Sequence, residues 1–363
     1  MQRALVIMAV FLLVLAALGV GALASHWPFW NRAWQWQQAA DGWPERLPGP
    51  TQVLRGGVAA LPLHLPADDT LAGLAGGATR ILLQAGVDGR GGSWFAEGAS
   101  AQSMVDGRGL TAGLLPPLYG LLGRNRPGLL DQPLGAHIDQ WRGSRGAITP
   151  RQLLWQMSGF PAGDFRPLNP ASARAQLASG PDFERAALHW RLSYPPGSHF
   201  EPTPVNAQLL AVLAARLAAA PYAQVLEQLL WSQLAANDAI AMLDRPRGNI
   251  AAHCCLTATA ADWLRLGLLL ANDGRIGERQ VLPAGFVAQM AADSPVHAGY
   301  GLGYRLSADA AGGHILILET TGRQLLIAPH SRRALLWVGE GMPPALQGIL
   351  AAAKVGRDNL LGE

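Results

Sequence analysis

The first long feature of the hydrophobic pattern is an apolar run at the N-terminus. Residues 4–24 carry no polar side chain, and at 1.5 Å per residue a helix of this length crosses a bilayer core of roughly 30 Å. Arg3 before the run favours a cytoplasmic N-terminus and an exported body. We therefore predict an inner-membrane protein with a single span through residues 4–24 and a periplasmic body. Residues 22–24 (ALA) also fit a cleavage site, so residues 1–25 are either a signal anchor or a signal peptide cleaved near Ala24.

A tryptophan-rich and proline-rich segment follows over residues 26–55, which we interpret as a spacer. Its aromatic residues are typical of the interface next to a membrane span, but they suit an amphipathic helix packed on the body equally well. The prolines indicate a linker. The residues concerned are Trp27, Trp30, Trp34, Trp36, Trp43, Pro44, Pro48 and Pro50.

The body, residues 56–363, begins with strands and continues with helices. Two short apolar runs, 80–86 and 93–98, flank the turn sequence VDGRGG and predict a β-hairpin. Helical spacing follows over 150–157, over 206–219 with Asn206 as a possible cap, and over 259–270. Thr259 and Asp262 have the spacing of a capping box for the last of these helices.

The pattern returns to strands near the C-terminus. Successive apolar runs with turn residues between them predict antiparallel strands, and the last residues suit a closing helix. The predicted strands cover 301–306, 314–319, 324–328 and 334–339, and the helix covers 343–363.

Composition narrows the class of protein. Half of the 363 residues are hydrophobic and 15% are charged, which supports a large core and excludes general disorder. The net charge of +3 is small and the arginines are scattered, so we predict no nucleic-acid partner. Lys354 is the only lysine, which excludes a catalytic lysine inside the body.

The two cysteines, Cys254 and Cys255, are adjacent, which excludes a disulfide scaffold and a CxxC metal site. Together with His253 they cannot supply the four ligands of a structural zinc site, and the other histidines are dispersed. We therefore expect no metal and no cofactor. Buried small cysteines are the favoured interpretation of the pair, and a disulfide between neighbours is the alternative.

Three segments resemble a known family. Residues 148–159 (ITPRQLLWQMSG) are similar to "ITxRHLLxMTSG", residues 256–283 to "LSATARDLARFGLLLLNDG…G…VLP", and residues 196–200 (PGSHF) to "PGxxF". These motifs occur in the class C-like branch of the serine β-lactamase and penicillin-binding-protein family, which includes esterases and 6-aminohexanoate-dimer hydrolases. The resemblance covers roughly residues 75–360.

The resemblance implies an α/β (α+β) fold, in which an antiparallel sheet is flanked by helices and carries an inserted all-helical subdomain. The α/β part would comprise about 56–105 and 290–363, and the helical part about 106–289. Function must still be argued from the site.

The family's S-x-x-K motif supplies a nucleophilic serine and a lysine one helical turn later. In one register, Ser103 is the serine and Asp106 stands at the lysine position. In the other, Val105 and Arg108 occupy the two positions. Neither register gives the dyad, because arginine is not a base near neutral pH.

We expect Ser103 at or just before the start of a helix, with Asp106 or Arg108 at the mouth of the cleft. The next residues contain Pro116 and Pro117, which we expect to kink that helix or end it early.

The family's Y-x-N motif is also absent. Counting on from residues 196–200, its tyrosine and asparagine positions hold Pro202 and Pro204, which have no side-chain donor or acceptor. Tyr194 precedes Pro202 by eight residues. It is a weak candidate for the missing group, and a packed tyrosine is the favoured interpretation.

The third family motif, K/H-T/S-G, is partly present. Thr320 replaces the cation, Thr321 and Gly322 match, and Arg323 lies three positions from the missing charge. The resemblance implies that this strand lies near Ser103 and could bind an extended ligand. Candidate substrate-binding residues are therefore Arg108, Thr320, Thr321, Gly322 and Arg323.

Joint loss of three motifs predicts a protein that kept the fold and lost acyl transfer. We expect an accessory or binding protein of the cell envelope, whose partner is a peptide, an acyl or glycan-like ligand, or an envelope protein. The alternatives are a serine hydrolase that uses Ser103 with Asp106 or Tyr194, and a structural subunit of an envelope complex.

Overall fold

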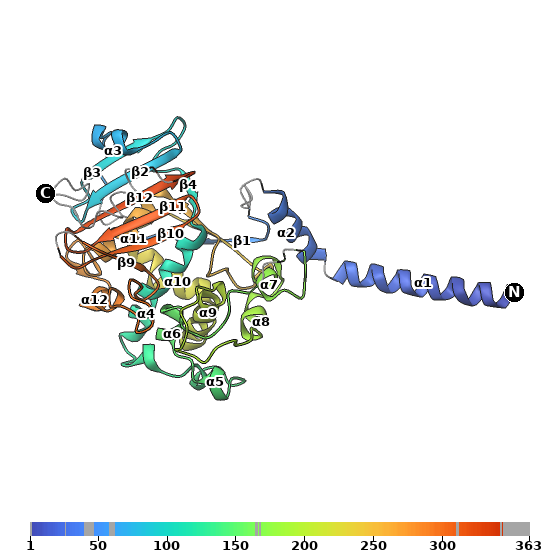
Figure 1. Ribbon diagram of the computed structural model, residues 1–363. Helices are drawn as coiled ribbons and strands as arrows, with labels where there is room; N and C mark the ends of the chain where they lie inside the picture. The colour runs from blue at the N-terminus through green and yellow to red at the C-terminus, as the bar shows by residue number, and fades with distance from the viewer. Residues whose placement is uncertain are drawn as a thin grey trace.

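The computed structural model describes residues 2–25, 27–39, 47–57, 62–163, 166, 168–309, 312–341 and 343. Two helices, α1 (Gln2–Ser25) and α2 (Trp27–Gln38), come first. Figure 1 shows α1 projecting from the body and α2 at the junction. No single helix in the described ranges is both long and apolar enough to cross a membrane. The bent pair Pro204–Ala218 and Tyr222–Leu234 meets that test only jointly, and Val10–Gly21 is a shorter apolar segment.

A six-stranded antiparallel sheet forms one end of the body, in the order β3-β2-β12-β11-β10-β9. It confirms the predicted strands with two shifts: the strand predicted over 93–98 covers 91–95, and the run at 301–306 forms a strand that begins later, at Arg305. The strands are β2 (Thr79–Gly86), β3 (Gly91–Phe95), β9 (Arg305–Ala308), β10 (His314–Thr320), β11 (Arg323–Ala328) and β12 (Arg333–Gly339).

Helix α11 (Ala260–Ala271) covers one face of this sheet, and α3 (Asp69–Leu74) lies over the other. A methyl group on Gly267 would lie 2.8 Å from the Ala334 side chain, so glycine permits α11 to approach β12 closely. The predicted cap is confirmed, because the Thr259 hydroxyl accepts the backbone N–H of Asp262 at 3.2 Å.

A second sheet has the order β1-β5-β6-β4 and was not predicted. Its strands are β1 (Thr51–Leu54), β4 (Met104–Asp106), β5 (Ala239–Met242) and β6 (Leu256–Thr259). Residues 51–54, which the sequence assigns to the spacer, thus pair with β5 in the body. A third pair is β7 (Arg275–Ile276) with β8 (Arg279–Gln280).

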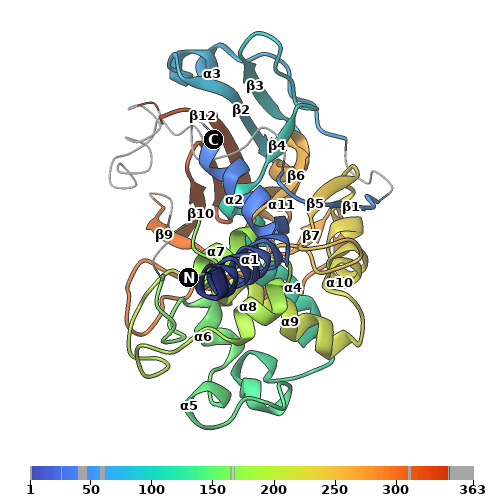
Figure 2. The ribbon, with the colours of Figure 1, turned by 90° about the vertical axis from the view of Figure 1, so that its right-hand side faces the viewer.

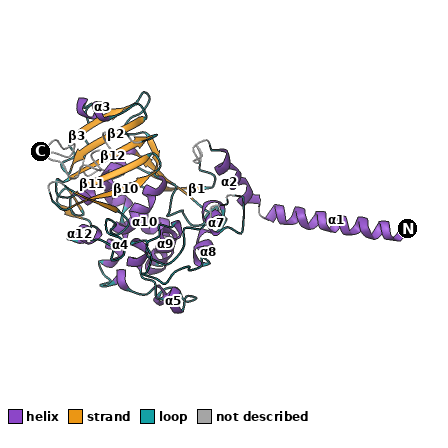
Figure 3. Cartoon of the chain, viewed as in Figure 1, coloured by secondary structure: helices purple, strands orange, loops and turns teal. Residues whose placement is uncertain are grey.

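The helical part follows β4 and precedes β5 in the sequence, and it lies beside the six-stranded sheet (Figures 2 and 3). Its α-helices are α4 (Leu115–Gly123), α5 (Gly143–Gly146), α6 (Pro150–Leu154), α7 (Ala173–Ser179), α8 (Phe183–Leu188), α9 (Pro204–Ala218) and α10 (Tyr222–Leu229), and α12 (Phe286–Met290) follows α11. The 3₁₀ turns are η1 (Arg108–Leu114), η2 (Leu129–Asp131), η3 (Leu134–Ala136) and η4 (Trp231–Leu234).

Two helix boundaries differ from expectation. Pro116 and Pro117 stand in the first turn of α4, so they start this helix instead of ending it, since the first helical N–H groups need no partner. Helix α9 begins at Pro204 after Thr203, and Asn206 is buried inside it instead of capping it. The predicted closing helix at 343–363 lies outside the described residues except for position 343.

Substitution of Asp262, at the start of α11, tests how much its buried hydrogen bonds stabilise the fold. Its fully buried carboxylate accepts the Thr259 hydroxyl at 2.6 Å and the Asn237 backbone N–H at 3.1 Å. Asp262→Ala leaves the buried Thr259 hydroxyl and the part-buried Asn237 N–H without this acceptor, so we expect a loss of about 3 kcal/mol in the free energy of unfolding. Urea denaturation measures it. Glu278→Ala, at an exposed side chain, is the control and should leave stability nearly unchanged. Equal effects in both variants would contradict the role of Asp262.

Candidate functional site

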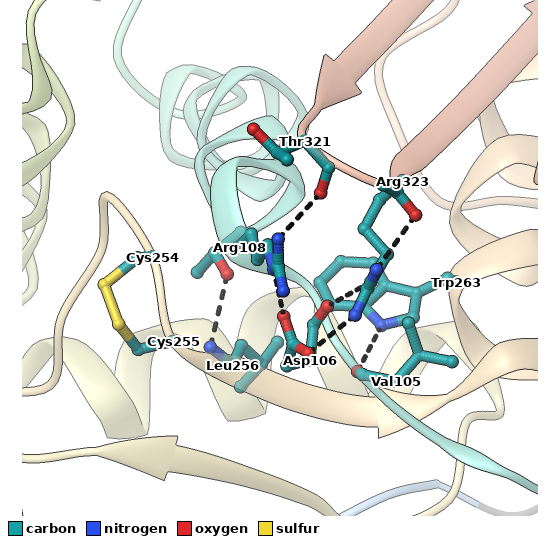
Figure 4. Close-up of polar contacts among 11 residues, drawn as sticks. Val105, Asp106, Arg108, Cys254, Cys255, Leu256, Trp263, Thr321 and Arg323 are labelled. Atoms are coloured by element: carbon teal, nitrogen blue, oxygen red, sulfur yellow. Dashed lines mark hydrogen bonds and ion pairs between the residues drawn. A yellow bond between two sulfur atoms is a disulfide. The ribbon is translucent and has the colours of Figure 1, made fainter. Parts of the chain in front are cut away.

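Asp106 lies between two arginines where the family's nucleophile segment is expected (Figure 4). Arg108 Nε donates to Asp106 Oδ1 at 3.2 Å, and Arg323 Nη2 donates to Asp106 Oδ2 at 2.8 Å. Side-chain exposure is 9% for Arg108, 14% for Arg323 and 22% for Asp106. The three residues form a largely buried ion cluster, which we call the 106–108–323 cluster.

The same arginines also bind main-chain carbonyls. Arg108 Nη1 donates to the Thr321 carbonyl at 3.1 Å, and Arg323 donates to the carbonyls of Asp106 and Gly322 at 3.2 and 2.9 Å. The cluster therefore joins the end of β4 to the turn between β10 and β11. Sequence reasoning named these side chains separately and did not predict that they bind one another.

The backbone around the cluster leaves little room. Trp263 Nε1 donates to the Val105 carbonyl at 3.1 Å, and the Gly107 N–H donates to the Leu256 carbonyl at 2.7 Å. A methyl group on Gly107 would stand 2.2 Å from the Trp263 ring, so only glycine fits there. Arg108 follows with φ of 44°, in the left-handed region that non-glycine residues rarely occupy.

The K/H-T/S-G-like strand β10 lies against η1. A methyl group on Gly109 would lie 3.2 Å from the Thr320 hydroxyl, so the end of β10 is packed closely on this segment. Figure 4 shows the Thr321 hydroxyl pointing away from Arg108, and Thr321 is exposed. Gly322 has φ of 73° in the turn that follows.

Ser103 does not start a helix, contrary to expectation. It stands just before β4, because residues 104–106 pair with β6, and η1 begins only at Arg108. Its hydroxyl accepts the Ser100 N–H at 2.9 Å, and its carbonyl accepts the Ala260 N–H at 3.0 Å. In the described ranges no hydrogen bond links Ser103 to Asp106 or Tyr194. These placements favour the register with Val105 at the serine position and Arg108 at the lysine position.

Tyr194 contacts residues outside the 106–108–323 cluster. Its ring stacks on His199 with centroids 4.2 Å apart, and its N–H donates to the Gly159 carbonyl at 3.1 Å. No described contact brings it to the 106–108–323 cluster.

A buried polar network that the sequence analysis missed lies near the failed Y-x-N position. Ser158 donates to Asn206 Oδ1 at 2.7 Å, and Asn206 Nδ2 donates to Gln156 Oε1 at 2.8 Å. Asn206 is inaccessible to solvent. The signal for it was an asparagine on an otherwise apolar helix, which in a core requires partners. The network ties the start of α9 to the end of α6.

The adjacent cysteines form a disulfide, Cys254–Cys255. Their burial confirms part of the favoured interpretation, with exposures of 8% and 0%, but the thiols are paired instead of free. The next residue, Leu256, donates its N–H to the Thr111 hydroxyl at 3.2 Å in η1 (Figure 4). The disulfide thus lies one residue from the backbone that frames the cluster.

His253, before the disulfide, is held neutral. Burial, together with a smaller effect of the charge of Arg174, lowers the pKa of His253 to about 4. Its ring lies edge-to-face against Phe183. Within the described residues, no three His, Cys, Asp or Glu side chains are grouped so that they could hold a metal ion.

Comparison with known proteins agrees with this geometry. The family model described as Beta-lactamase matches residues 125–345. No curated protein sequence matches significantly.

Solved structures share the fold. A Bacillus anthracis protein assigned as a 6-aminohexanoate-dimer hydrolase has a TM-score of 0.68 and 16% identity, over 84% of this chain and 89% of that one. A Bacteroides dorei protein assigned as a β-lactamase has a TM-score of 0.63 and 17% identity, over 79% and 98%. A D-stereospecific amidohydrolase from Streptomyces sp. has a TM-score of 0.56 and 15% identity, over 78% and 97%.

The antiparallel sheet, its covering helices and the site's position define a β-lactamase-like α/β protein of the serine hydrolase and penicillin-binding-protein type. With more than half of its length matched by the family model, the chain belongs to the Beta-lactamase family.

Substitution of Asp106 tests the cluster. Asp106→Asn leaves two largely buried guanidinium groups without a counter-charge, so we expect a loss of about 2 kcal/mol in the free energy of unfolding. Urea denaturation measures it. The control is Glu319→Gln, which breaks the exposed Arg305–Glu319 pair and should have a much smaller effect. If the two variants lose the same stability, the cluster is no more important than a surface pair.

The low pKa of His253 makes stability pH-dependent. The unfolded chain protonates this residue near its ordinary pKa of 6.5, whereas the folded chain does so only near 4. The contribution of neutral His253 is therefore present above pH 6.5 and lost as pH falls toward 4, by up to about 3 kcal/mol. His253→Gln should flatten the stability profile in this window, measured by urea denaturation from pH 4 to 7. His330→Gln, at an exposed site, should leave the profile unchanged, and an unflattened His253→Gln profile would refute the assignment.

Proposed function

We propose that this protein is an exported, membrane-anchored member of the Beta-lactamase family that has lost acyl transfer and acts as a binding or accessory protein of the cell envelope. The observation that carries the proposal is the 106–108–323 cluster. The charged side chains at the expected nucleophile segment, Asp106, Arg108 and Arg323, are bound to one another there.

The chemistry of serine acylation needs a nucleophile and a group that accepts its proton. Val105 cannot attack a carbonyl, and Arg108 keeps its proton near neutral pH. Asp106 accepts hydrogen bonds from arginines on both carboxylate oxygens, which opposes its use as a base. A variant mechanism could replace one missing group, but here the serine position holds the apolar Val105 and the lysine position holds Arg108, which is engaged in the ion cluster.

The alternative function is a serine hydrolase that uses Ser103. The observation in its favour is that Ser103 carries a hydroxyl and lies close in sequence to the site. Two observations oppose it. The Ser103 hydroxyl accepts the Ser100 N–H in a turn before β4. The Asp106 carboxylate, at the other end of β4, is bound to Arg108 and Arg323 and makes no hydrogen bond to Ser103 within the described ranges. Tyr194 is stacked on His199 and offers no support.

The ligand class follows from the strand that remains. Thr320, Thr321 and Gly322 keep the position of a substrate-binding strand end, and the exposed Thr321 hydroxyl is a donor and acceptor. The structural neighbours include proteins described as acting on amides. We infer a peptide, acyl or glycan-like ligand, or a protein partner presenting one.

The membrane anchor is supported by α1. Its 24 residues span about 36 Å as a helix, but the apolar segment that the structure describes in it is the shorter stretch Val10–Gly21, so a full span rests on the apolar sequence of residues 4–24. Large apolar side chains within the described stretch are exposed, such as Phe11 at 62% and Leu13 at 69%. Exposure of these apolar side chains to water is unfavourable in free energy, so we infer that they lie in a lipid bilayer. We place the body in the periplasm at the inner membrane, with secretion after cleavage near Ala24 as the alternative.

Covalent labelling tests the loss of acyl transfer. The purified protein is incubated with a fluorescent penicillin and, separately, with a fluorescent fluorophosphonate, beside a reactive serine hydrolase as positive control. We expect no stable labelling, because no activated nucleophile is present. Ser103→Ala is the matched variant. Labelling of the wild type that disappears in Ser103→Ala would establish the hydrolase instead.

A further inference from the structure

Helix α2 has two different faces. One face carries Phe29, Arg32, Ala33 and Trp36, all buried in the body. The other presents Trp27 and Trp34, which are 63% and 56% exposed. Because residues seven apart return to the same side of a helix, these two indoles form one exposed stripe.

The buried face fastens α2 to the helical part of the body. Arg32 Nη1 donates to the Gly180 carbonyl at 3.1 Å, and Trp36 Nε1 donates to the Ala178 carbonyl at 3.2 Å. Phe29 and Ala33 pack with Ala175 on α7. Helix α2 is therefore a fixed part of the body, and its exposed stripe has a fixed direction relative to the site.

The exposed stripe is unusual for this chain. The other tryptophans that the structure describes are buried or half-buried. Trp27 follows α1 within two residues, and the described part of α1 exposes large apolar side chains between Met8 and Val20. Figures 1 and 2 show α2 between α1 and the body. Indole rings, with an apolar body and one N–H donor, are favoured at the headgroup level of bilayers.

We propose that Trp27 and Trp34 insert into the headgroup region of the lipid bilayer, so that α2 docks the body on the membrane surface. This inference rests on the proposed anchoring by α1. The occupant of the stripe is the lipid surface itself, because the stripe begins where the apolar helix ends. The body is then held in one orientation to the membrane and does not swing on a flexible tether.

Quenching by brominated lipid tests the insertion. The full chain is reconstituted in phosphatidylcholine vesicles with or without acyl chains brominated near the headgroup, and tryptophan fluorescence is compared. Helix α1 contains no tryptophan, so α1 itself gives no signal. We expect Trp27→Phe/Trp34→Phe to lose a quenched component that the wild type shows. Trp94→Phe, on β3 at the far side of the body in Figure 1, is the control and should keep that component.

Two further measurements separate the outcomes. Resistance to carbonate extraction reports the α1 anchor, and chemical cross-linking reports a second copy. A chain that resists extraction, with equal quenching in the wild type and the double variant, overturns the docking but leaves the anchor standing. Cross-linking of the wild type that the double variant abolishes, without quenching, shows instead a contact between copies. Release of the wild type by carbonate overturns both proposals.

Discussion

A carboxylate held between two guanidinium groups is the interaction on which the arrangement of the site depends. Asp106 lies at the end of β4, Arg108 begins η1, and Arg323 begins β11, so one cluster joins two consecutive segments to a strand that is distant in the sequence. A largely buried charge requires compensation, and each of these groups supplies it for another. The turn between β10 and β11 is consequently tied to the nucleophile segment by side chains, where catalytic relatives would need an open place for substrate.

The fold was predictable where the pattern was long and locally capped. The strands at 79–86 and 333–339 contain the apolar runs 81–83 and 334–338, and α11 carries its cap at Thr259 in the sequence itself. The second sheet was not predicted because its strands have three or four residues each, too few to show the alternation of apolar and polar positions. Pro116 was misjudged because a proline is equally compatible with the start and with the interruption of a helix, and its neighbours decide which.

The sequence predicted which residues belong to the site, but it did not predict which of them contact one another. Asp106, Arg108 and Arg323 were candidates from motif positions, but 217 residues separate Asp106 from Arg323, and only the packing of β10 on η1 brings them together. Ser103 was misplaced because its expected helix is preempted by the pairing of β4 with β6. The sequence left the oxidation state of Cys254 and Cys255 undecided for a simpler reason. Adjacent cysteines carry the same sequence signal whether they are oxidised or reduced.

The contact between Gly107 and Trp263 has a consequence for substitutions at the site. No side chain fits at Gly107 while the indole stays in place, and the indole also donates to the carbonyl of Val105. A side chain at Gly107 would first have to displace Trp263, and the Val105 carbonyl would then lose its donor. Positions 107 and 263 are therefore interdependent, so a residue larger than glycine at position 107 requires a smaller residue at position 263.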